Sequence, residues 1–187
     1  MTGPFPELFH FTPSERNGAR RLVPKALATP SDLEAGAAER IVDAINPLVA
    51  DAFALYLKTK NFHWHMSGSH REYHLLLDEH ADQIFPMTDV LSEGVRKVGG
   101  TTIRSIGHVG RLSDIKDDDR DYVKPFEMLE ELCDDNKNFA ARQRAAHEVV
   151  SDLKDVATTS ILEVFIDETE RRTWFLYETV VGAEHTA

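Results

Sequence analysis

The sequence predicts an all-α fold: a four-helix bundle with a long crossover connection between the second and third helices. Apolar residues recur at helical spacing over four long segments, and no segment alternates apolar and polar residues as a half-buried strand would. The 187 residues are enough for one domain with a substantial core. A connection over residues 101–124, with a short helix inside it, is long enough to let the third helix cross the bundle.

The first helix is predicted over residues 31–63. Ser31, followed three residues later by Glu34, forms a capping-box pattern that would satisfy backbone N–H groups of the first turn. Residues 1–30 hold five of the eight prolines and no sustained periodicity, so we expect a flexible N-terminal tail outside a domain over residues 31–187. The apolar face of this helix is Leu33, Ala37, Ile41, Ala44, Leu48, Ala52 and Leu55.

Local signals also delimit the other three helices. The second is predicted over residues 70–98 and ends at Gly99-Gly100, a typical C-terminal stop. The third begins near Pro125, since proline is favoured in the first turn, and runs to about Val150. The fourth covers about 154–181, and its expected apolar residues are Val156, Leu162, Phe165, Ile166, Phe175 and Leu176.

Four side chains on the second helix predict a metal site. His74, Asp78, Asp89 and Glu93 fall within an arc of about 100° on one helix face. Imidazole nitrogen with carboxylate oxygen suits iron, zinc or manganese. His74 and Asp89 are about 22 Å apart along a continuous helix, so the two pairs cannot bind one metal within one chain. Two copies paired antiparallel about a two-fold axis would bring the first pair of one chain beside the second pair of the other.

Charge and composition limit the classes of function. The net charge of −11 argues against a constitutive nucleic-acid binder, because that binding neutralises phosphates with Lys and Arg. No apolar run approaches the roughly 20 residues of a membrane span. The single Cys133 excludes an internal disulfide framework, and the first residues lack the plan of a secretory signal, so we expect a cytoplasmic protein. The tail is basic, with Arg16, Arg20, Arg21 and Lys25 against Glu7 and Glu15, which leaves weak DNA contact and association with the nucleoid open.

Three motifs together resemble the Dps family, the mini-ferritins of the ferritin-like superfamily. They are Asn61-Phe62-His63-Trp64-His65-Met66-Ser67-Gly68, His74-x-x-x-Asp78-Glu79 and Asp89-x-x-x-Glu93, and the resemblance covers about residues 31–181. It implies a ferritin-like four-helix bundle that assembles as a dodecamer of two-fold dimers. It also implies a ferroxidase that oxidises Fe(II) with hydrogen peroxide or dioxygen, stores ferric mineral and protects DNA from oxidative damage.

The resemblance also implies a ligand set. His63, His74 and Asp78 of one chain and Asp89 and Glu93 of its mate would form a di-iron site at the two-fold interface. Trp64 resembles the family tryptophan beside the iron site, and Asp82 on the same face is a candidate extra carboxylate or hydrogen-bond partner. Candidate pore or cavity acids are Asp152, Asp155 and Glu163, with a solvated outer face as the alternative for each.

Two departures from the family pattern define the alternatives. His63 and His74 are eleven residues apart where the family usually has twelve, and Gly94 stands where the family commonly has Arg. One alternative is therefore an assembled cage whose iron site is disabled by the shorter spacing. The other is a DNA-compacting structural protein that acts through the tail. Zinc and manganese remain open as substitutes for iron.

Overall fold

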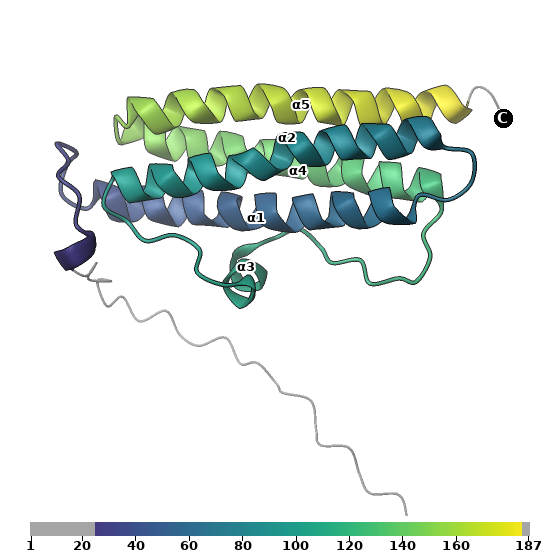
Figure 1. Ribbon diagram of the computed structural model, residues 1–187. Helices are drawn as coiled ribbons and strands as arrows, with labels where there is room; N and C mark the ends of the chain where they lie inside the picture. The colour runs from purple at the N-terminus through teal and green to yellow at the C-terminus, as the bar shows by residue number, and fades with distance from the viewer. Residues whose placement is uncertain (1–24, 185–187) are drawn as a thin grey trace, which may run out of the picture.

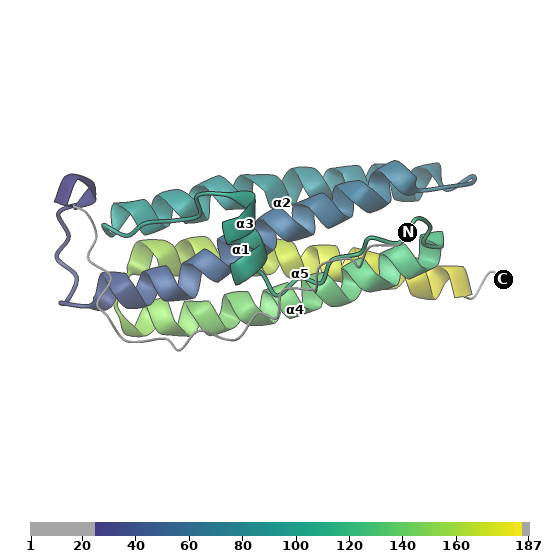
Figure 2. The ribbon, with the colours of Figure 1, turned by 90° about the horizontal axis from the view of Figure 1, so that it is seen from below.

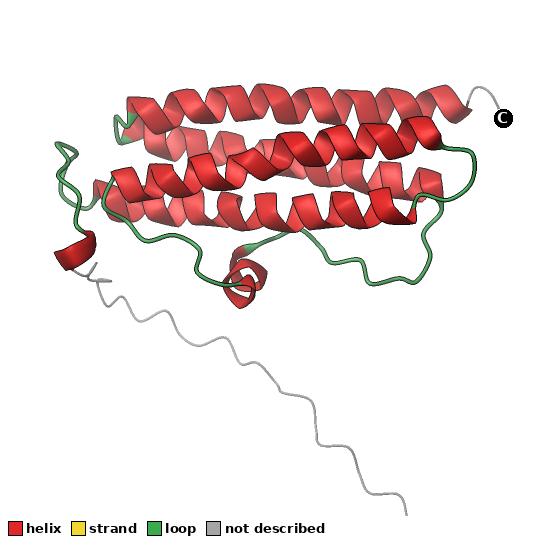
Figure 3. Ribbon diagram, in the orientation of Figure 1, coloured by secondary structure: helices red, strands yellow, loops and turns green. Residues whose placement is uncertain are grey.

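A computed structural model describes residues 25–184 of the chain. Over this range the protein is built of helices and loops and contains no β-strand, which confirms the predicted all-α class (Figure 3). The elements are η1 (Lys25–Leu27), α1 (Ala37–His65), α2 (Arg71–Lys97), α3 (Ile106–Leu112), α4 (Pro125–Asp152) and α5 (Val156–Glu184).

The four long helices form two antiparallel hairpins, α1 with α2 and α4 with α5 (Figure 1). The chain leaves α2 at one end of the bundle and returns along α1 to the other end before α4 begins, with α3 lying across α1 (Figure 2). Consequently α2 and α4 run in the same direction, and α1 is antiparallel to both. The predicted crossover with a short internal helix is confirmed.

A buried carboxylate attaches this crossover to the bundle. Asp51 on α1 is fully buried, and its Oδ1 accepts hydrogen bonds from Ser113 Oγ at 3.0 Å and the Asp114 amide at 2.8 Å. Its Oδ2 lies 2.8 Å from Nη1 of Arg142 on α4. Burial raises the pKa of Asp51, and the hydrogen bond from the Asp114 amide acts in the opposite direction. One carboxylate thus links α1, the crossover and α4.

The predicted apolar faces form the core, with three exceptions on α5, of which Ile166 is half-buried and outside the core. Val156 is 78% exposed because it begins α5 at the end of the bundle. Phe175 is 43% exposed and packs on its neighbour Trp174, with 4.8 Å between ring centroids. The predicted residues found in the core are Ile41, Leu48, Ala52, Leu55, Leu162, Phe165 and Leu176, and α4 contributes Leu129, Leu132, Phe139 and Val150.

The predicted start of the first helix is wrong by six residues. The Ser31 hydroxyl accepts a hydrogen bond from the Leu33 amide at 3.2 Å, a local turn instead of a helix cap. Gly36 then adopts φ = 87°, a left-handed conformation that cannot continue a right-handed helix, and α1 begins at Ala37. The capping box with Glu34 therefore does not form.

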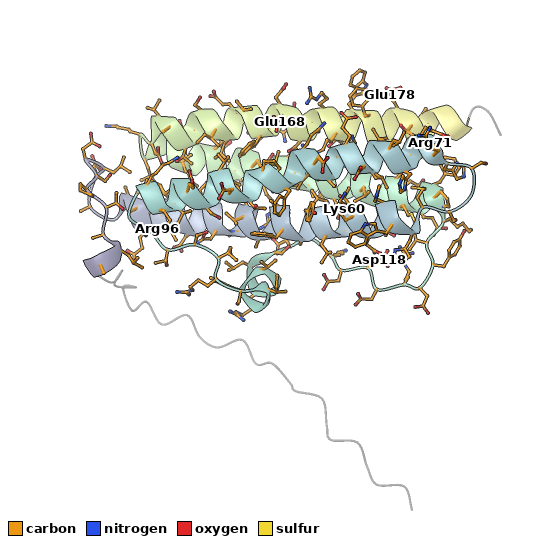
Figure 4. All side chains as sticks on the ribbon, viewed as in Figure 1. Lys60, Arg71, Arg96, Asp118, Glu168 and Glu178 are labelled. Carbon is orange, nitrogen blue, oxygen red and sulfur yellow. The ribbon has the colours of Figure 1, made fainter. Side chains whose placement is uncertain are left out.

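The end of α2 agrees with prediction and holds the segment before α1. Gly99 has φ = 84°, and the Gly100 amide donates to the Val95 carbonyl at 2.9 Å. Arg96, labelled in Figure 4, donates from Nη2 to the Leu27 carbonyl at 2.9 Å. The predicted tail over residues 1–30 falls mostly on residues 1–24, which lie outside the described part of the chain. No described helix is both long enough and apolar enough to cross a membrane.

Candidate metal centre

The α1–α2 hairpin brings the first two predicted ligands together. His63 in the last turn of α1 and His74 in the first turn of α2 are stacked, with 3.8 Å between ring centroids and 22° between planes. His63 Nδ1 donates to the His74 carbonyl at 2.9 Å, and His74 Nδ1 donates to the His63 carbonyl at 2.9 Å. The eleven-residue spacing is therefore compatible with paired rings.

This reciprocal bonding selects one tautomer of each neutral imidazole. A carbonyl oxygen only accepts hydrogen bonds, so each Nδ1 carries a proton, and the Nε2 of each neutral ring keeps its lone pair. Metal-ligating histidines commonly use one nitrogen for the metal and donate from the other to a carbonyl. His63 and His74 are thus held in a tautomer suited to metal binding.

Asp78 lies beside this pair on α2. Its Oδ1 is 3.8 Å from His63 Nε2, a separation that two metal–ligand bonds of about 2.1 Å can span. The same oxygen accepts a hydrogen bond from Nζ of Lys60, labelled in Figure 4. That bond lowers the pKa of Asp78 from its ordinary value, and the charge of Lys60 acts in the same direction.

The second pair of predicted ligands lies farther along α2, apart from the first. Asp89 and Glu93 are exposed, and Glu93 Oε2 forms an ion pair with Lys97 Nζ at 3.6 Å. Within the described part of one chain, no three His, Cys, Asp or Glu side chains are grouped so that they could hold a metal ion. Within one chain, the two candidate pairs on α2 therefore lie apart.

The remaining candidate residues have different environments. Trp64 is 62% exposed next to His63, and Asp82 is exposed one helical turn after Asp78. Asp152 and Glu163 are exposed near the α4–α5 turn. Asp155 is instead buried, because its carboxylate caps α5 by accepting from the Thr158 amide at 3.1 Å. Its carboxylate therefore has a structural role as a helix cap.

One cavity lies away from the predicted ligands. It has a volume of about 560 Å³ and lies between the crossover and α4, lined by acids and bases together. Lys58 pairs with Asp135 at 2.7 Å, and Arg120 pairs with Asp118 at 2.6 Å (Asp118 is labelled in Figure 4). Because these carboxylates already have basic partners, the cavity is a poorer candidate for a metal than the histidine pair.

Sequence reasoning missed two features near the site. Lys60 stands three residues before His63, and this i, i+3 spacing places both on one face of α1. His80 on α2 and Arg172 on α5 form a buried polar layer, in which Arg172 Nε donates to Asn136 Oδ1 at 3.0 Å. The helical period would have indicated that His80 faces the core, since Leu77 and Ile84 flank it at the spacing of one turn.

Comparisons with known proteins agree with the fold and the motifs. Residues 42–184 match the family model of the ferritin-like domain. A low-temperature-induced protein of Nostoc is 27% identical over 144 residues, which are 76% of this chain and 80% of the relative. The DNA protection during starvation protein of Agrobacterium fabrum is 27% identical over 153 residues, 81% of this chain and 94% of the relative. The crystal structure of an archaeal Dps homologue from Halobacterium salinarum superposes with a TM-score of 0.78 at 25% identity, covering 88% of this chain and 93% of the other.

Proposed function

The chain belongs to the ferritin-like family and, within it, to the Dps family, and from this premise we propose that it is a ferroxidase that oxidises Fe(II) and stores ferric mineral. The observation that carries the proposal is the His63–His74–Asp78 half-site. Two imidazoles, each with its Nε2 lone pair free, lie beside a carboxylate. These three groups are part of a ligand set suited to Fe(II).

The proposed site is completed by Asp89 and Glu93 of a second copy. One chain supplies only half of the ligands, and large apolar side chains are exposed on α1 and α2. A second copy packed antiparallel about a two-fold axis would bury this surface and bring the second carboxylate pair into place. The exposed apolar residues concerned are Leu57, Trp64, Leu75 and Phe85. We propose that such dimers build a dodecameric cage.

Iron is the substrate of the proposed reaction. Two Fe(II) ions each give one electron to hydrogen peroxide, whose O–O bond breaks, and two protons complete two molecules of water. His63 and His74 bind through Nε2, Asp78 through its carboxylate, and Trp64 is placed beside them. Removal of Fe(II) and peroxide together would protect DNA from oxidation, and the name of the Agrobacterium relative describes DNA protection during starvation. The comparisons support iron as the metal and give no support to zinc or manganese. Cytoplasmic localisation stays a prediction.

The test is anaerobic Fe(II) oxidation with stepwise addition of hydrogen peroxide, followed by ultraviolet absorbance. The double variant His74→Ala, Asp78→Ala is compared with His65→Ala, Glu79→Ala, which removes neighbouring exposed groups of the same types. We expect about two Fe(II) oxidised per peroxide by the native protein and the control, and a rate near that of buffer for the site variant. An assembled native protein no faster than buffer would refute the proposal and favour a cage with a disabled site.

DNA binding through the tail is a second, separable function. It is supported by the basic composition of residues 1–30, whose three arginines all lie within residues 1–24. Deletion of residues 1–24 leaves Leu27 and Thr29 in their contacts with Arg96 and so should leave the bundle intact. A gel shift that depends steeply on salt and is lost in the deletion would support it, whereas no shift at low salt would exclude it.

A further inference from the structure

Both pairs of proposed ligands contain a carboxylate that is paired with a lysine of its own chain. Lys60 on α1 donates to Asp78 Oδ1, and Lys97 pairs with Glu93 at 3.6 Å one turn along α2. The two ion pairs differ in environment. The Lys60 side chain is 16% exposed, whereas the Lys97 side chain is 65% exposed, so water screens the second pair much more strongly.

The Lys60 ammonium contacts a carboxylate oxygen that the proposed site needs for the metal. The Nε2 lone pair of His63 and Asp78 Oδ1 are 3.8 Å apart, and both are electron-rich. Two such atoms repel each other unless a positive charge lies near them. In the metal-free chain the charge that contacts Asp78 Oδ1 comes from Lys60. A divalent ion bound to the same oxygen would stand within a few ångströms of this ammonium and would be repelled by it.

A second carboxylate is available to the ammonium if it leaves Asp78. Asp82 follows Asp78 by one helical turn on the same face of α2. Its charge already acts on Lys60, raising the pKa of the amine together with the stronger effect of Asp78. Asp82 therefore provides a place for the displaced ammonium without a change in the helices.

We propose that Lys60 is a built-in competitor for the metal: its ammonium holds Asp78 in the metal-free protein and moves towards Asp82 when a divalent ion binds. This inference rests on the proposed function, because it concerns the same site. Lys60 is thus a positioning residue that sets the affinity for divalent ions. Removal of its charge should strengthen binding about tenfold, as expected for a repulsive monovalent cation beside a partly exposed site.

The experiment is anaerobic titration of the assembled full-length protein with Co²⁺, a probe that needs no oxidation, followed by calorimetry and visible absorbance. Lys60→Gln is expected to bind Co²⁺ about tenfold more tightly than the native protein. Lys60→Arg, which keeps the charge, should bind no more tightly than native. The matched control Lys97→Gln should change the affinity by less than about twofold, because its ion pair is exposed.

Asp82→Asn provides a second test with Lys60 and the ligands unchanged. It should weaken Co²⁺ binding about threefold in the native background and have no effect in the Lys60→Gln background, because the displaced ammonium is then absent. Equal affinities of native and Lys60→Gln proteins would overturn the inference while leaving the ferroxidase proposal in place. Absence of Co²⁺ binding beyond that of the His74→Ala, Asp78→Ala variant, in native and Lys60→Gln proteins alike, would overturn both.

Discussion

His80 predicts a specific sensitivity of the metal-free protein to acid. The ring is 2% exposed in the bundle core. Gly94 of α2 faces Thr158 of α5, since a Cβ added at Gly94 would lie 4.0 Å from Thr158 Oγ1. His80 lies fourteen residues before Gly94, and Arg172 lies fourteen residues after Thr158, so the antiparallel helices place both at the same level. Burial, with smaller effects of Arg172 and Arg171, lowers the pKa of His80 to about 3.

The sign of the effect follows from the two states. Unfolded His80 takes up a proton near its ordinary pKa of 6.5, while folded His80 stays neutral down to about pH 3. The unfolded state therefore binds more protons between these values, and stability falls as the pH is lowered through this window. Each pH unit below 6.5 costs about 1.4 kcal/mol per chain, so the loss at pH 5 is about 2 kcal/mol.

The assay is urea unfolding of chelator-treated protein at pH 7 and pH 5 and at one protein concentration, since assembly makes stability depend on concentration. The variant His80→Gln removes the titrating group and keeps a polar side chain, and His65→Gln removes an exposed histidine as a control. Between the two pH values the native protein and the control should lose about 2 kcal/mol more than His80→Gln. Equal losses in all three proteins would refute the reasoning.

Further substitutions test a close backbone approach, a left-handed residue and a helix cap. Gly100→Ala should lower the free energy of unfolding by about 1–3 kcal/mol in thermal unfolding, because the new Cβ collides with Val42 Cγ2. The control Gly110→Ala places its Cβ in open space and should cause no such loss. Equal losses in the two variants would contradict the packing argument. Lys154 has φ = 62°, so Lys154→Gly should stabilise the α4–α5 turn by about 0.5–1 kcal/mol, and a loss of stability would contradict it. Asp155→Ala removes the α5 cap and should cost about 1 kcal/mol in urea unfolding, while Asp155→Asn should retain most of it.

Some parts of the fold could be predicted because their signals are local. Gly99 ends α2, Pro125 begins α4, and the long spacing between them predicts a crossover; each depends on backbone preferences of neighbouring residues. The capping box predicted at Ser31 does not form, although its signal is local too. A hydroxyl can serve several nearby amides, and the left-handed Gly36 decided where α1 starts.

The candidate site also has a part that the sequence could predict and a part that it could not. The helical period alone places His74 and Asp78, with Asp89 and Glu93, on one face of α2 and separates the two pairs by distance. The stacking of His63 on His74 needs the hairpin, because each imidazole is held by the carbonyl of a residue on the other helix. The Lys60–Asp78 ion pair likewise joins two helices, which periodicity along one helix cannot reveal.

The sequence by itself determined the helical class, the number of long helices, the crossover and the face on which the α2 ligands lie. These depend on intervals of a few residues, over which backbone geometry is nearly constant. Only the tertiary structure decided the histidine tautomers and the cation beside Asp78. Each depends on which side chain of a distant segment reaches a given atom, and packing of the whole bundle sets that distance.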